Sequence, residues 1–257
     1  MISKAQIKLV RSLEQKKFRT EHGLFIAEGS KLVSDMSRAF CCRQLFAVDE
    51  TAADFISDKA LIQTITRQEL NQISLLRNPQ DMLALFQIVN RDIDDLNLDD
   101  SRLVLALDDI QDPGNLGTII RTADWFGIRN IVCSEHTADV YNPKVVQATM
   151  GALARVSVFY TDLPVWLDKI KNVPIYGTLL DGRNIYQTEL SSGGVIVMGN
   201  EGNGLSDEVR RCVSSRLFIP SYPPDVETSE SLNVAIATAL VCSEFRRRMV
   251  QNPKAGV

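Results

Sequence analysis

The sequence contains only two histidines, His22 and His136, and its five cysteines include no Cys-x-x-Cys pair. These counts argue against a histidine-rich metal site, a disulfide framework and a Ser-His-Asp triad. No run of 18 apolar residues occurs, and the N-terminal "MISKAQIKLVRSLEQKK" lacks the apolar centre of a signal peptide. We therefore expect a cytoplasmic protein that binds neither a membrane nor a metal ion.

The two best-known phosphate-binding loops are also missing. No stretch matches the Gly-x-Gly-x-x-Gly dinucleotide fingerprint or the Gly-Lys-Ser/Thr of a P-loop. An NAD-linked oxidoreductase, which would also be an α/β protein, is therefore disfavoured.

Acidic residues outnumber basic ones and give a net charge of −4, but the basic residues are unevenly distributed. The first 22 residues are basic and include Lys16, Lys17 and Arg19, whereas "NRDIDDLNLDD" at 90–100 is acidic. A basic cluster of this kind is either a solvated helix face or a binding surface for RNA. The acidic stretch lacks hydrophobic periodicity and is the best candidate for a linker.

Apolar runs alternate with helical patterns on both sides of this linker. The runs before it, at 24–27, 44–48 and 82–89, predict a small α/β domain. The runs after it predict a parallel sheet covered on both faces; they lie at 103–107, 131–133, 156–159, 174–178, 194–198 and 216–219. In such sheets ligands bind beyond the carboxyl ends of the strands, so the loops after these strands are the candidate sites.

The loop "DPGNLGTIIR" at 112–121 follows the first of these strands. Asn115 is a plausible N-cap and Gly127 a plausible C-terminal glycine of the helix that it opens. Arg121 lies off the helix's apolar stripe, in early turns where a cation is unfavourable towards the helix dipole. It is either a plain surface arginine or a functional group.

Two further loops carry similar signals. In "GNEGNGLSDEV", glycines that include Gly199 permit a tight turn or a close approach to a ligand around Glu201. After "RLFIP", a polar loop leads into an apolar helix that we expect to be capped near Ser229 or Ser231, with Asn233 in its first turn. Each signal alone is compatible with a simple structural role, but together they place four polar side chains beyond the ends of one sheet.

The three stretches "DPGNLGTIIRTADWFG", "VMGNEGNGLS" and "IP…ESLNVAIA", in this order, resemble the three motifs of the SpoU (TrmH-type) branch of the SPOUT methyltransferases. The segments "FRTEHGLFIAEGSKLV" and "NPKVVQATMGALARV" also resemble that family, so that the likeness spans nearly the whole chain. It implies a ribosomal-protein-like RNA-binding domain at 1–95 and a methyltransferase domain at 101–257 with a deep trefoil knot, an exception to the rule against knotted chains.

The resemblance also implies an activity: transfer of a methyl group from S-adenosylmethionine to a ribose 2′-hydroxyl of RNA. The implied cofactor contacts are Thr178, Leu179, Gly199, Ile219 and Leu232. The implied catalytic residues are Asn115, Arg121, Glu201, Ser231 and Asn233. Lys16, Lys17 and Arg19 are then assigned to RNA binding, with ribosomal RNA favoured over transfer RNA because of the separate N-terminal domain.

This chain departs from the family pattern at two places. Nine residues, "SYPPDVETS" at 221–229, stand where the pattern has only a few, and Thr149 stands where serine is more common. We therefore expect a longer loop beside the cofactor, and at Thr149 a retained hydroxyl.

Two questions about mechanism and assembly remain open at the level of sequence. Arg121 is either the general base or, as we favour for a guanidinium that stays protonated, a group that binds phosphate and stabilises the developing alkoxide. A catalytically silent RNA-binding protein on the same fold would lack Arg121 or Asn233, and both are present. The last helix is apolar nearly all round from Leu232 to Cys242, which predicts a homodimer that buries a second side of it.

Overall fold

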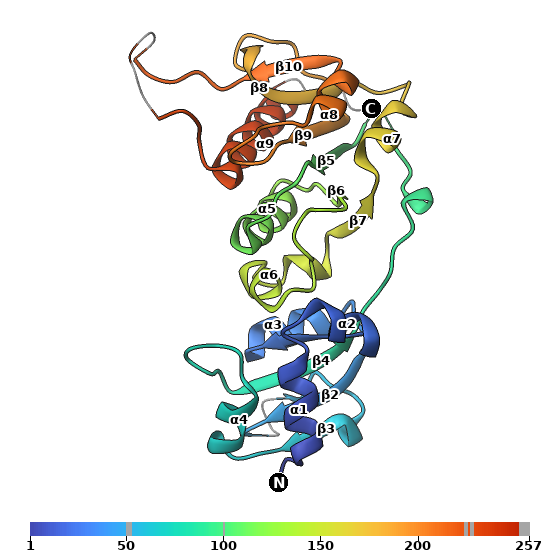
Figure 1. The fold of residues 1–257 in the computed structure, drawn as a ribbon, viewed down its shortest axis with the longest axis vertical. Coiled ribbons are helices and arrows are strands. Elements are labelled where there is room, and N and C mark those ends of the chain that lie inside the picture. Colours follow the sequence, from blue (N-terminus) through green and yellow to red (C-terminus); the bar gives the residue numbers. More distant parts are fainter. Residues whose placement is uncertain (50–52, 100, 224–225, 227–228, 252–257) are drawn as a thin grey trace. The chain divides into compact units, whose positions relative to one another are not determined.

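The computed structural model of the chain describes residues 1–49, 53–99, 101–223, 226 and 229–251. It contains two compact units, one formed by Met1–Asn90 with Asp139–Arg155 and the other by Arg91–Ala138 with Val156–Val257 (Figure 1). The segment Asp139–Arg155 therefore connects two strands of the second unit along the chain but packs within the first.

The first unit is built on a four-stranded mixed sheet with the order β1-β4-β2-β3. β4 runs antiparallel to β1 and β2, and β3 runs parallel to β2. Its strands are β1 (Leu24–Glu28), β2 (Cys42–Ala47), β3 (Ile62–Thr64) and β4 (Met82–Gln87). Its helices are α1 (Lys4–Ser12), α2 (Lys16–His22), α3 (Ser30–Ser37), α4 (Arg67–Ile73), α6 (Pro143–Ala148) and the short 3-10 helices η2 (Lys59–Leu61) and η4 (Ala152–Ala154).

Local signals fix the helices that cover the first face of this sheet. Capping boxes start α1 at Ser3 and α4 at Thr66, each closed by the side chain three residues further on. Both helices lay apolar side chains on the same face of the sheet, where Val10 and Leu70 join Ile26 and Leu85 in one core.

The opposite face is covered by α3 and by the inserted segment. Phe25 points away from the Ile26 core because successive strand residues alternate between faces. Its ring lies 4.8 Å from that of Tyr141 and 5.1 Å from that of Phe40. The Tyr141 hydroxyl donates to the Val89 carbonyl oxygen at 2.8 Å, so the insert is hydrogen-bonded to the segment that follows β4.

Arg19 requires a correction to the predicted RNA-binding cluster. Its side chain is only 2% exposed, and its guanidinium binds Asp139 and donates to the carbonyl oxygens of Leu13 and Glu14. A buried guanidinium with its donors in use cannot face RNA, so the assignment of Arg19 is wrong. Lys16 and Lys17 are exposed, as the prediction requires.

The second unit contains a six-stranded sheet, all of whose pairings are parallel, with the order β10-β8-β9-β5-β6-β7. Its strands are β5 (Leu103–Leu107), β6 (Asn130–Ser134), β7 (Ser157–Thr161), β8 (Ile175–Asn184), β9 (Gly194–Met198) and β10 (Ser215–Phe218). Its helices are α5 (Pro113–Trp125), α7 (Leu163–Asp168), α8 (Asp207–Cys212), α9 (Val234–Gln251) and the 3-10 helix η3 (Ile93–Asp95). The predicted parallel sheet is confirmed.

Helices cover both faces of this sheet, with α7 and α8 on one side and α5 and α9 on the other (Figure 1). On the first side Leu163 and Val209 pack against Val104 and Val195. On the other, the rings of Tyr176 in β8 and Phe245 in α9 meet edge to face at 5.0 Å. None of the described helices has the length and apolar character needed to cross a membrane.

Candidate active site

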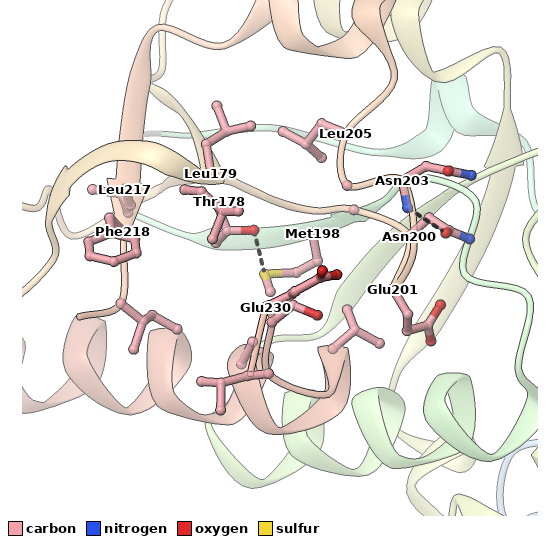
Figure 2. Close-up of a pocket in the computed structure, with 18 of the residues that line it drawn as sticks. Thr178, Leu179, Met198, Asn200, Glu201, Asn203, Leu205, Leu217, Phe218 and Glu230 are labelled. Atoms are coloured by element: carbon pink, nitrogen blue, oxygen red, sulfur yellow. Dashed lines mark hydrogen bonds between the residues drawn. The ribbon is translucent and has the colours of Figure 1, made fainter. Parts of the chain in front are cut away.

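A cavity of about 680 Å³ opens at the carboxyl ends of β9 and β10 and beside the middle of β8 (Figure 2). Its walls are mainly apolar, as at Leu179, Met198 and Phe218, and the loop into α9 closes one side. A concave, largely apolar cavity with a few polar groups is the usual form of a cofactor site.

One wall is a stretch of β8 that leaves the pairing with β10. The strands pair at Tyr176 and Gly177, and pairing resumes only at Arg183; of the residues between, 178–181 line the cavity. A Cβ on Gly182 would lie 2.5 Å from the Leu217 carbonyl carbon, which makes glycine necessary where the strands come together again.

Asp181 anchors this stretch through two ion pairs. Its Oδ2 lies 2.6 Å from Nη2 of Arg210 in α8 and 2.9 Å from Nη1 of Arg216 in β10. Desolvation raises the pKa of Asp181, but the hydrogen bond and charge of Arg210, together with the charge of Arg216, lower it overall. The ionised Asp181 carboxylate therefore links this wall of the cavity to α8 and β10.

The glycine-rich loop after β9 is closed on itself. Asn200 and Gly204 exchange both backbone hydrogen bonds at 2.9 Å, and Asn200 Oδ1 accepts from the backbone N–H groups of Gly202 and Asn203. A Cβ on Gly199 would lie 2.4 Å from the Gly204 carbonyl carbon. Gly199 is thus required for the close return of the loop, and it also lines the cavity.

Asn115 is not the N-cap of α5, contrary to the prediction. Asp112 is, because its Oδ1 accepts from the Asn115 backbone N–H at 2.8 Å and Pro113 takes the first helical position. The Asn115 side chain is therefore free for another contact. Its Nδ2 donates to Glu201 Oε1 at 2.5 Å, linking the first motif to the second.

Asn233 caps α9 and completes a chain of three side chains. The helix begins at Val234, and Asn233 Oδ1 accepts from the backbone N–H of Ala235 at 3.0 Å; the expected cap at Ser229 or Ser231 is wrong. Because the cap fixes Oδ1 as the acceptor, Nδ2 must be the outward donor, and it donates to Asn115 Oδ1 at 3.0 Å. The cap thereby fixes both amide orientations and directs Asn115 Nδ2 towards Glu201.

The remaining predicted residues fall into two groups. The cavity-lining residues include all five predicted cofactor contacts and two of the predicted catalytic residues; these are Thr178, Leu179, Gly199, Ile219, Leu232, Glu201 and Ser231. Arg121 is exposed on α5, outside the cavity lining, and its side chain makes no hydrogen bond or ion pair within the part of the chain described.

Several lining residues were not predicted, notably Asp181, Met198, Arg210 and Glu230. Met198 is the last residue of a predicted strand and could have been inferred from the rule for strand ends. Asp181 and Arg210 lacked such a signal because their pairing is nonlocal. The predicted long loop at 221–229 includes residues outside those described, whereas Thr149 is buried and its hydroxyl donates to the Val146 carbonyl oxygen at 2.7 Å.

Comparison with protein families matches residues 102–243 to the SpoU rRNA Methylase family and residues 4–84 to an MRM3-like substrate binding domain. The first match covers more than half of the chain and contains the cavity and the Glu201–Asn115–Asn233 chain. The protein belongs to the SpoU rRNA methylase family.

Individual relatives of this SpoU protein match over almost its whole length. The 23S rRNA (guanosine(2553)-2′-O)-methyltransferase RlmP of Bacillus subtilis is 30% identical over 246 residues, which cover 94% of this chain and 96% of RlmP. The structure of a TrmH-family protein from Porphyromonas gingivalis is 39% identical with a TM-score of 0.85, covering 96% of this chain and 99% of that one. An AdoMet-bound rRNA methyltransferase from Sinorhizobium meliloti is 28% identical, also with a TM-score of 0.85, and each chain is covered to 97%.

Proposed function

We propose that this SpoU protein transfers the methyl group of S-adenosylmethionine to a ribose 2′-hydroxyl of RNA, and that the RNA is ribosomal. The observation that carries the proposal is the Glu201–Asn115–Asn233 chain beside the cavity, which joins all three family motifs by hydrogen bonds. RlmP, similar over nearly its full length, bears the name of a 23S rRNA 2′-O-methyltransferase.

Mapping 2′-O-methyl groups in RNA from cells with and without the protein tests the proposal. A single ribosomal nucleotide should lose its methyl group when the protein is absent. Loss confined to transfer RNA would overturn the choice of substrate, and no loss in any RNA would favour a silent RNA-binding protein.

The cavity fits S-adenosylmethionine in size and chemistry. Its volume of about 680 Å³ lies within the range of small-molecule sites, and its apolar walls suit an adenine ring. We propose that Thr178, Leu179, Gly199, Ile219 and Leu232 hold the cofactor, with main-chain groups offering most of the polar contacts. When bound, S-adenosylmethionine supplies the activated methyl group.

The chain's own residues then align and polarise the attacking hydroxyl. Methyl transfer from a sulfonium is an in-line displacement whose leaving group departs neutral, so it depends on alignment and on a polarised hydroxyl. We propose that Arg121 binds the neighbouring phosphate and stabilises the developing alkoxide. Asn115, Glu201, Ser231 and Asn233 order the loops that receive the ribose.

Binding of the cofactor should not depend on metal. Within the described ranges, no group of three or more His, Cys, Asp or Glu side chains is arranged to hold a metal ion. Calorimetry should give the same Kd for S-adenosylmethionine with and without a chelator. A larger Kd after chelation would show that cofactor binding requires a metal ion.

Replacing Asn233 by aspartate should separate folding from catalysis. Aspartate is as good an N-cap as asparagine, so α9 and the melting temperature should be retained within about 2 °C. The donor to Asn115 is lost and a carboxylate faces its Oδ1, so we expect kcat to fall by about tenfold, since one hydrogen bond is worth about 1 kcal/mol. Asn233→Ala is the matched variant: it should lower both kcat and stability. An unchanged kcat in Asn233→Asp would show that the Glu201–Asn115–Asn233 chain does not contribute to catalysis.

We propose that residues 1–95 form the RNA-binding domain and 101–257 the methyltransferase domain, with Asp139–Arg155 added to the first by its packing. The MRM3-like substrate-binding match over residues 4–84 and the exposure of Lys16 and Lys17 support this.

The double variant Lys16→Ala, Lys17→Ala tests the RNA surface. If each lysine neutralises one phosphate, the slope of log K against log salt should become shallower by about 1.4 to 1.8. The Kd for S-adenosylmethionine should not change. A variant with the two exposed acids Glu14 and Glu21 replaced by glutamine is the control. An unchanged slope in the lysine variant would show that Lys16 and Lys17 are solvent-exposed residues that do not contact RNA.

We propose further that the protein is a homodimer. Ile236 and Leu240, four residues apart on one side of α9, are 56% and 38% exposed, and Leu232, in the loop just before the helix, is 47% exposed. Trp125, at the end of the neighbouring α5, is 83% exposed. A second copy of the chain would cover this apolar side.

The proposal also includes a deep trefoil knot and a cytoplasmic location. The sheet order, in which β10 lies at the edge beside β8 while α9 returns to pack on α5, supports the knot. All five cysteines lie in the described part of the chain and are free thiols, which fits a reducing compartment.

A further inference from the structure

The charged side chains of the cavity are not equivalent. The described lining residues include three carboxylates, of Asp181, Glu201 and Glu230, and one guanidinium, of Arg210. Two of the carboxylates are already engaged. Asp181 Oδ2 is shared between Arg210 and Arg216, and Glu201 Oε1 accepts from Asn115.

Glu230 is the carboxylate that has no such partner. Among the described residues it makes no ion pair or side-chain hydrogen bond, and Figure 2 draws its carboxylate towards the interior of the site from the loop that leads into α9. It directly precedes Ser231 and Leu232, two of the predicted site residues. Glu230 is exposed, and an unpaired carboxylate among the lining residues of a mainly apolar cavity favours a ligand that carries positive charge.

The cofactor and the product of the proposed reaction differ in charge. S-adenosylmethionine carries a sulfonium, an ammonium and a carboxylate, for a net charge of +1, whereas S-adenosylhomocysteine has lost the sulfonium charge and is neutral overall. Apolar walls contact both molecules in the same way, so they cannot distinguish them. A carboxylate beside the sulfonium can, because its attraction vanishes once the methyl group has left.

We propose that Glu230 is a specificity-determining residue that favours the charged cofactor over the neutral product. The inference rests on the proposed function, since it assigns a role within the same cofactor site. Its consequence is that product release becomes easier at the moment of transfer, which limits inhibition by accumulated S-adenosylhomocysteine.

Calorimetry with three ligands on the full-length protein tests the role of Glu230. The ligands are S-adenosylmethionine, sinefungin, whose amine is positively charged in place of the sulfonium, and S-adenosylhomocysteine. In Glu230→Gln the Kd of the two cationic ligands should rise by about fivefold, the effect of removing one unit charge a few ångströms away at a solvent-facing site. The Kd of S-adenosylhomocysteine should stay the same, and 0.5 M salt, chosen to bring the Debye length down to roughly 4 Å, should reduce the difference.

Glu208→Gln is the matched control, because Glu208 is an exposed acid of α8 outside the cavity lining and pairs with Arg211. It should leave all three Kd values unchanged. Equal weakening of all three ligands in Glu230→Gln, or no change in any, would overturn the proposal. Failure of the wild-type protein to bind any of the three would instead overturn the proposed function, so the two failures can be told apart.

Discussion

Replacing Arg19 by alanine should lower the free energy of unfolding of the first unit by about 3 kcal/mol or more, because it leaves a largely buried carboxylate without its partner. Asp139 is 16% exposed and would lose its cation. The carbonyl oxygens of Leu13 and Glu14 would lose their donor as well. The loss should free the Asp139–Arg155 insert from the segment between α1 and α2.

The measurement must report on the first unit alone. Both tryptophans, Trp125 and Trp166, belong to the second unit, so hydrogen exchange in β1 and β4 is the better probe. Exchange there should accelerate in Arg19→Ala but stay near wild type in Lys17→Ala, whose side chain is exposed and whose loss should cost within about 0.5 kcal/mol. Equal exchange in the two variants would show that the buried ion pair does not stabilise this unit.

The case of Arg19 illustrates what the sequence could not reveal. Lys16, Lys17 and Arg19 look alike in a basic run, and the partner that buries Arg19 lies 120 residues away. Burial of this kind is decided by tertiary packing, which has no local signature. The three-residue strand β3 was missed for a related reason, since a run that short has too few positions for alternation to be visible.

The sheet of the second unit was predictable because its strands are continuous apolar runs bounded by polar loops. The rule that ligands bind at strand ends then placed Asn115, Glu201 and Asn233 together, and the structure joins them by hydrogen bonds. The sequence did not show which of these residues caps a helix and which one joins the motifs. Asp112 and Asn115 are both good capping residues, and Pro113 at the first helical position was the signal that should have decided for Asp112.

Arg121 remains the residue with the largest predicted effect on catalysis. Because it lies outside the cavity lining, Arg121→Ala should leave the Kd for S-adenosylmethionine within twofold of wild type. If it stabilises the developing alkoxide, kcat should fall by about 10² to 10³, as when one oxyanion donor is removed. Arg129→Ala is the control, since Arg129 is another exposed arginine of the same unit, paired with Asp124. Wild-type kcat in Arg121→Ala would exclude the residue from the chemistry.

Mixed dimers decide whether Arg121 acts in its own subunit or in the partner. The second chain must lose cofactor binding without losing its fold, and Gly199 is unsuitable because any side chain there meets the Gly204 backbone. Ala237 is better, since it lines the cavity from α9 and phenylalanine at that position would fill the space.

Arg121→Ala and Ala237→Phe chains should each be inactive alone. If Arg121 serves the partner's site, a heterodimer regains one working site, and random pairing of equal amounts should restore about a quarter of the wild-type sites in an isologous dimer. Mixed dimers that stay inactive, or a protein that sediments as a monomer at micromolar concentration, would place Arg121 at the site of its own chain, because no shared site could then form.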